Sequence, residues 1–128
     1  MTETAELESE VRTLLEQGDL DGAVEFLNNR HPAEIGGVID ELDGDAAYAL
    51  FDQLDRRTQA RILPYMQPSH QLSMVQHLGR HAQARLLTDM NADERADLYQ
   101  ELPEDVQEAL MPALAKAERE DLLRLTSY

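Results

Sequence analysis

A twelve-residue repeat of apolar residues constrains the fold of this chain more than any other feature of the sequence. Pairs of apolar residues recur at this spacing, without an insertion, from residue 26 to residue 123. The pairs are Phe26-Leu27, Val38-Ile39, Leu50-Phe51, Ile62-Leu63, Met74-Val75, Leu86-Leu87, Leu98-Tyr99, Leu110-Met111 and Leu122-Leu123. From the second pair on, a further apolar residue follows three positions later: Leu42, Leu54, Met66, Leu78, Met90, Leu102 and Leu114. Such self-similarity is typical of arrays of small helical units.

The length of the period argues against one continuous helix. Twelve residues overshoot three full helical turns by about 120°, so a single helix would point successive pairs in three directions. Each unit is therefore predicted to be a short helix with a sharp turn after it. Helix-capping residues fall in phase with the repeat, which supports this interpretation. The predicted N-caps are His31, Asp43, Asp55 and Asn91, and prolines at 32 and 68 suit a first helical turn.

Two prolines fall elsewhere in the repeat. Pro64 and Pro112 share a position inside the predicted last turn of their helices. Proline there removes a backbone donor and clashes with the preceding turn. We expect both prolines to shorten or kink their helices.

A single domain spanning residues 1–128 is the predicted organisation. A short helix with one apolar stripe is unstable alone, but stacking of neighbouring units buries the stripes. We expect an all-α, armadillo-like fold, a right-handed superhelix or solenoid of about ten short helices. Residues 1–30 form the lead-in, with two non-repeating helices near 3–17 and 20–29, and residues 31–126 form the repeat units.

The charge of the chain limits its partners. It carries 26 acidic side chains against 11 lysines and arginines, a formal net charge of −15. This balance disfavours nucleic acid and anionic membrane surfaces, and leaves cations or basic surfaces as partners. An acidic surface also serves solubility alone. No apolar run is long enough to cross a bilayer, so we expect a soluble chain without membrane insertion.

The candidate metal ligands lie in the stretch MNADERADLYQELP, residues 90–103. Asp93, Asp97 and Glu101 are four residues apart and fall on one helix face, with Glu94 beside them. Like charges at this spacing destabilise a helix slightly, and hard cations such as Mg²⁺ bind one or two carboxylates plus retained waters. The stretch is interpreted either as a solvated acidic face or as a weak cation site, with Asp93 and Asp97 as the favoured ligands.

Other patterns point to structure and not to chemistry. Asp43 and Asp55 in a second acidic stretch (residues 39–55) are explained as caps. His77 and His81 have a zinc-like spacing, but Gly79 at a unit boundary should place them on separate helices. The sequence contains no cysteine, no phosphate-binding glycine loop and no nucleophile motif, so a non-enzyme is predicted.

These residues resemble a known family. The stretch His31-Pro32-Ala33-Glu34-Ile35, the segment VIDEL, and units ending FDQL, LTDM and LYQEL are similar to the N-terminal cytosolic domain of MgtE-type magnesium transporters. The closing LLRLTSY resembles the point where that family's chain enters a pair of CBS domains.

The resemblance implies a regulatory role. Mg²⁺ would sit weakly between Asp93, Asp97 and acidic residues of the CBS domains, dock this domain onto them, and hold the pore shut. The full-length protein would be a homodimeric transporter, with this domain at the cytoplasmic face of the membrane. Its CBS and transmembrane domains lie outside this chain.

The sequence departs from the family pattern at Arg61 and Arg85, where the family often has an acid, so an ion site at 61 is absent. Short-helix repeats also resemble the armadillo-like middle domain of the flagellar motor switch protein FliG. The alternative function is therefore a protein-binding adaptor with no metal role.

Overall fold

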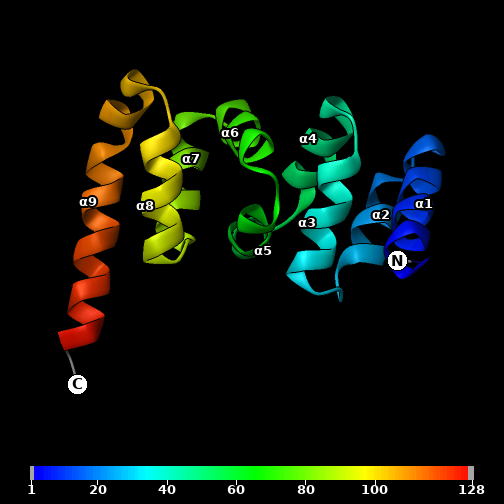
Figure 1. The fold of residues 1–128 in the computed structure, drawn as a ribbon, viewed down its shortest axis with the longest axis horizontal. Coiled ribbons are helices and arrows are strands. Elements are labelled where there is room, and N and C mark those ends of the chain that lie inside the picture. Colours follow the sequence, from blue (N-terminus) through cyan, green and yellow to red (C-terminus); the bar gives the residue numbers. More distant parts are fainter. Residues whose placement is uncertain (1, 127–128) are drawn as a thin grey trace. The chain divides into compact units, whose positions relative to one another are not determined.

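Every element that the structure describes is a helix. The computed structural model describes residues 2–126, with side chains described for residues 5–120, and it contains no strand within that range. The elements are α1 (Thr2–Glu16), α2 (Leu20–Leu27), α3 (Pro32–Glu41), α4 (Gly44–Gln53), α5 (Arg56–Ile62), the 3₁₀ turn η1 (Leu63–Tyr65), α6 (Pro68–His77), α7 (Arg80–Asp89), α8 (Ala92–Glu101) and α9 (Glu104–Thr126) (Figure 1). The all-α prediction is confirmed.

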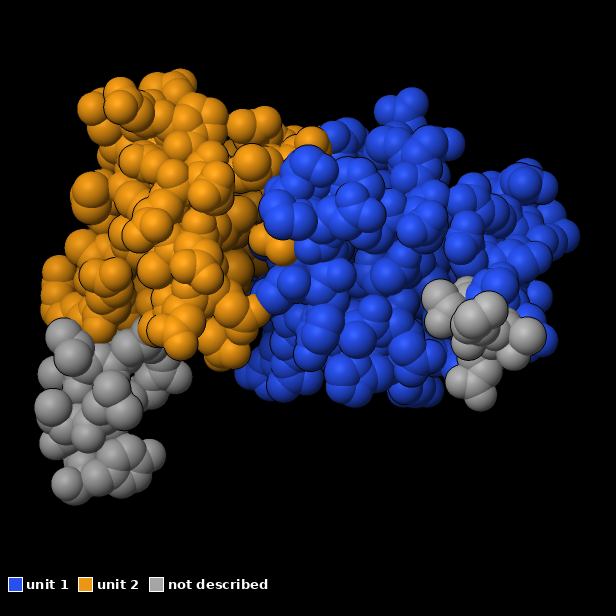
Figure 2. Space-filling model, in the orientation of Figure 1, with its two compact units in different colours: residues 1–70 blue, residues 71–128 orange. Residues whose placement is uncertain are grey.

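The chain divides into two compact units, residues 1–70 and residues 71–128 (Figure 2). In the first unit, α1 packs on α2 and α3, α2 packs on α4, and α3 packs on α4, α5 and η1. In the second unit, α7 and α8 both pack on α9. The right-handed superhelix and the single domain stay predictions.

Four of the described helices, α2 to α5, begin at a side-chain cap. The carboxylates of Asp19, Asp43 and Asp55 accept the N–H groups of residues 22, 46 and 58 at 2.9, 3.0 and 2.8 Å. His31 caps α3 by accepting the Ala33 N–H on its Nδ1 at 3.0 Å. These contacts satisfy donors that the first helical turn leaves free. The predicted caps at His31, Asp43 and Asp55 are confirmed.

Most helices of the array end in the same way, and the ends explain the period. In five of them the residue after the last turn is extended, and its N–H donates to the carbonyl three residues earlier. These residues are the third apolar positions of the repeat, Leu42, Leu54, Met66, Met90 and Leu102. One further residue then precedes the following helix. A ten-residue helix, as in α3, α4, α7 and α8, plus these two linking residues makes one twelve-residue unit.

The apolar pairs form the core of each unit. Both members are buried in every pair from Val38-Ile39 to Leu98-Tyr99. The pair at 110–111 departs from the pattern, because Leu110 is buried whereas Met111 is 51% exposed. The pair at 122–123 lies outside the residues whose side chains are described.

The prediction of separate short helices is wrong for the last part of the repeat. One helix of 23 residues, α9, runs through Pro112 and joins two expected units. No capping residue stands near position 115, and the segment Ala113–Lys116 consists of alanine, leucine and lysine, which are strong helix formers. Pro64 acts as expected: α5 has only seven residues, and the chain continues through the 3₁₀ turn η1.

Candidate functional site

The four candidate ligands lie on α8, where local sequence explains the start of the helix. Asp93 and Glu94 occupy its first turn, where negative charge is favoured by the free N–H groups of a helix start. Asn91 holds the N-cap position, but its side chain accepts no helix N–H. Instead its amide donates to Glu94 Oε1 at 2.8 Å. Asn91 therefore sits at the predicted place but does not cap the helix with its side chain.

The exposed face of α8 carries carboxylates and no cation. Asp93, Asp97 and Glu101 are exposed and Glu94 is half-buried. The spacing of four residues places Asp93 and Asp97 one turn apart on the same side of the helix. Leu98 and Tyr99 are buried, as expected for the opposite side.

These carboxylates do not form a complete metal site among the described residues. No group of three or more histidine or acidic side chains in that part of the chain is arranged to hold a metal ion. The fit to Mg²⁺ is partial, since this ion commonly takes one or two carboxylates and keeps several waters. Asp93 and Asp97 could therefore hold Mg²⁺ only as part of a shell that water or another surface completes.

Arg95 is the residue on α8 that sequence reasoning missed. Its side chain is 1% exposed, although it carries a charge. The guanidinium donates from Nε to the Leu87 carbonyl and from Nη2 to the Met90 carbonyl, both at 2.8 Å. These carbonyls lie at the end of α7, whose last turn leaves acceptors without helical partners. Arg95 thus joins α8 to the end of the preceding helix.

The same connection recurs with glutamine in other units. Gln59, Gln83 and Gln107 donate from Nε2 to the carbonyls of Phe51, Val75 and Tyr99, at 2.8, 2.8 and 2.9 Å. In each case the donor follows the acceptor by eight residues, as Arg95 follows Leu87. We call this contact the repeat latch. The signal was present in the sequence, because Gln59, Gln71, Gln83, Arg95 and Gln107 stand twelve residues apart.

The second acidic stretch has structural roles where contacts are seen. Besides the caps Asp43 and Asp55, it contains Asp40, which accepts the Gln67 N–H at 3.2 Å and contacts His70 Nδ1. The hydrogen bond from the backbone N–H of Thr58, followed by that from its side chain, lowers the pKa of Asp55. The structural interpretation of Asp43 and Asp55 is confirmed, and the Asp40–His70 contact was not predicted.

The remaining predicted residues are separate from one another. His77 ends α6 and His81 lies in α7, so the two histidines are on different helices, as expected. Arg61 and Arg85 are exposed and make no hydrogen bond or ion pair with a described residue. A cavity of about 500 Å³ opens in the first unit, and it is lined by Glu6, Leu7, Glu10, Phe26, Arg30 and Glu34, none of which is a candidate ligand.

The fold and the site define an all-helical repeat protein whose candidate ligands are carboxylates on one helix face. The model of the MgtE intracellular N domain matches residues 30–128, and the chain belongs to this family. This is a family of regulatory domains of magnesium transporters, not a catalytic family. No curated protein and no solved structure matches the chain. Among the described residues, no helix is long and apolar enough to cross a membrane.

Proposed function

We propose that this chain senses Mg²⁺ and gates a magnesium transporter by docking onto its CBS domains when Mg²⁺ is abundant. The observation that carries the proposal is the charge arrangement of α8. Its outer face has the exposed carboxylates of Asp93, Asp97 and Glu101, whereas its one cationic side chain, Arg95, is buried. The choice of a magnesium transporter as the protein that is gated rests on the family to which the chain belongs.

Electrostatics supports Mg²⁺ as the ligand that controls docking. A chain with a formal charge of −15 repels a second acidic surface, and the repulsion between exposed charges weakens only over about a Debye length. A divalent cation shared between the surfaces turns this repulsion into attraction. Because Mg²⁺ would bind the docked state better than the separated state, it would shift the population toward the closed pore.

Asp93 and Asp97 are the favoured ligands for a geometric reason. Both carboxylates are exposed and lie one turn apart, so they can meet an ion without any rearrangement of the helix. Glu101 extends the same face by one further turn. Glu94 is less available, because one of its oxygens already accepts from Asn91. Acidic side chains of the CBS domains would complete the shell.

The experiment uses this chain joined to the CBS domains of its transporter. Protection from protease is measured as a function of Mg²⁺ concentration at constant ionic strength. The double variant Asp93→Asn plus Asp97→Asn should raise the Mg²⁺ midpoint by about tenfold, the loss expected for about 1.4 kcal/mol of binding energy.

A matched control separates specific ligation from loss of net charge. Asp21 and Glu25 on α2 are also exposed and four residues apart. The variant Asp21→Asn plus Glu25→Gln removes the same charge and should leave the midpoint unchanged. Equal midpoints for the wild type and the Asp93/Asp97 variant would reject the proposal. They would favour the adaptor function, in which partner affinity is indifferent to Mg²⁺.

A further inference from the structure

The repeat latch, which would reach the Ile39 carbonyl, is missing at the end of α3, and a contact from α1 reaches the Glu41 carbonyl of the same turn instead. The residue that would latch α4 to the end of α3 is at position 47, twelve residues before Gln59. This residue is Ala47, which is buried and has no polar group to donate. Position 47 therefore gives the last turn of α3 no side-chain donor of the kind that the ends of α4, α6, α7 and α8 receive.

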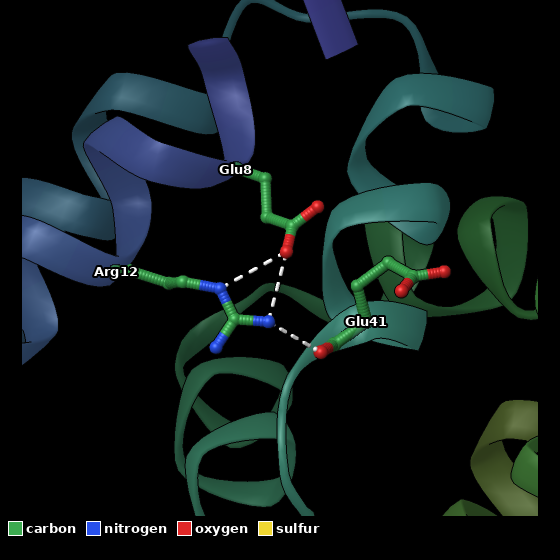
Figure 3. A network of polar contacts seen from close by, with 3 residues as sticks. All are labelled: Glu8, Arg12 and Glu41. Atoms are coloured by element: carbon green, nitrogen blue, oxygen red, sulfur yellow. Dashed lines mark hydrogen bonds and ion pairs between the residues drawn. The ribbon is translucent and has the colours of Figure 1, made fainter. Parts of the chain in front are cut away.

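Arg12 of α1 supplies a donor to this turn from 29 residues away. Its Nη2 donates to the Glu41 carbonyl at 2.7 Å. The Nε and Nη2 atoms also donate to Glu8 Oε1, at 3.0 and 2.8 Å. Figure 3 shows the guanidinium between the Glu8 carboxylate on α1 and the Glu41 carbonyl at the end of α3. Glu8, one turn earlier on the same helix, orients the arginine toward α3.

We infer that α1 is the N-terminal cap of the repeat array and that Arg12 replaces the latch missing at position 47. Terminal units of repeat proteins are commonly atypical, because they must close the array on one side. In this chain α1 lies outside residues 30–128, the part that matches the family, yet packs directly on α3. The contact also places a cation at a helix C-terminus, where the helix dipole favours it.

Hydrogen exchange and urea unfolding of the whole chain test this inference. Arg12→Ala should speed exchange about fivefold in peptides covering α1 and residues 38–42, and leave peptides of the second unit unchanged. The urea midpoint of the first unit should fall by about half a molar unit. Arg61→Ala is the matched control, because Arg61 is an exposed arginine of the same unit whose side chain makes no hydrogen bond or ion pair with a described residue.

Two further variants test whether Arg12 acts by replacing a latch or only by forming a surface ion pair with Glu8. Glu8→Gln removes the ion pair but keeps an acceptor for Arg12, so it should change exchange at residues 38–42 by less than twofold. In the Arg12→Ala background, Ala47→Gln should restore most of the urea midpoint by adding a latch of the kind that Gln59 makes. Equal exchange in the Arg12→Ala and Arg61→Ala variants would overturn the inference. If Ala47→Gln does not restore the urea midpoint in the Arg12→Ala background, the claim that Arg12 replaces a missing latch is overturned.

Discussion

The buried guanidinium of Arg95 donates to the carbonyl of Leu87, eight residues earlier, at 2.8 Å. This contact joins the helix that carries the candidate ligands to the helix before it. Glutamines make the equivalent contact in three other units. In these four units the repeat thus combines an apolar pair that fills the core with one long polar side chain that satisfies the end of the preceding helix.

The latch at Arg95 predicts different costs for two substitutions. Arg95→Ala leaves the Leu87 and Met90 carbonyls buried without their donor and opens a cavity, so it should lower the free energy of unfolding by about 3 kcal/mol. Arg95→Gln keeps a donor of the kind used in the other units and should cost about 1 kcal/mol. Urea unfolding followed by far-UV circular dichroism measures both. Equal losses for alanine and glutamine would show that the hydrogen bond at this position is not what stabilises the unit.

Substitutions at two adjacent glycines of α3, Gly36 and Gly37, test how closely this helix packs. A Cβ at Gly36 would lie 2.9 Å from the Ile62 carbonyl oxygen and 3.0 Å from the Tyr65 Cβ, whereas a Cβ at Gly37 meets nothing within 4 Å. Gly36→Ala should therefore push α3 away from η1 and destabilise by about 1–3 kcal/mol. Gly37→Ala should stabilise by about 0.5–1 kcal/mol, because alanine favours the helix. Thermal unfolding distinguishes them, and a stable Gly36→Ala variant would contradict this packing.

The cap at Asp55 predicts a pH dependence with a defined sign. The Thr58 backbone N–H, followed by the Thr58 side chain, lowers the pKa of Asp55 in the folded state. A lowered folded pKa adds stability above the unfolded pKa of about 3.9, and this stability is lost as the pH falls through the folded value. Asp55→Ala should cost about 1 kcal/mol at pH 7 and much less at acid pH. Unfolding curves at pH 7 and in the acid range test this, and a pH-independent difference would refute the assignment.

The proline inside α9 should limit the stability of that helix. Pro112 cannot donate to the carbonyl four residues earlier, and its ring crowds that turn. Pro112→Ala should raise the free energy of unfolding by about 1–3 kcal/mol. Pro68→Ala is the control, since Pro68 is the first residue of α6, where proline removes no helical hydrogen bond and no gain is expected. Lower stability of the Pro112→Ala variant would mean that the proline fits a bend required by the packing of α9.

Local patterns in the sequence determined much of this fold. The apolar pairs identified the core from Val38 to Tyr99, and capping chemistry located the starts of α3, α4 and α5. These features depend only on side-chain period and on residues close in the chain, so no knowledge of the tertiary structure is needed. The acidic face of α8 follows from the same period, because Asp93 and Asp97 lie one turn apart. Its predicted Mg²⁺ ligation stays a prediction.

Only the tertiary structure decided which polar residues are buried and what they contact. Arg95 is a cation in an acidic helix, yet it is buried against the end of α7, because the turn between the helices brings two carbonyls within reach. Arg12 reaches Glu41 across 29 residues for the same kind of reason. The continuity of α9 through Pro112 is different, because the lack of a capping residue near position 115 and the helix formers at 113–116 are local signals. A hydrogen bond between helices depends on where packing places the acceptor, and the order of residues along one helix does not contain that position.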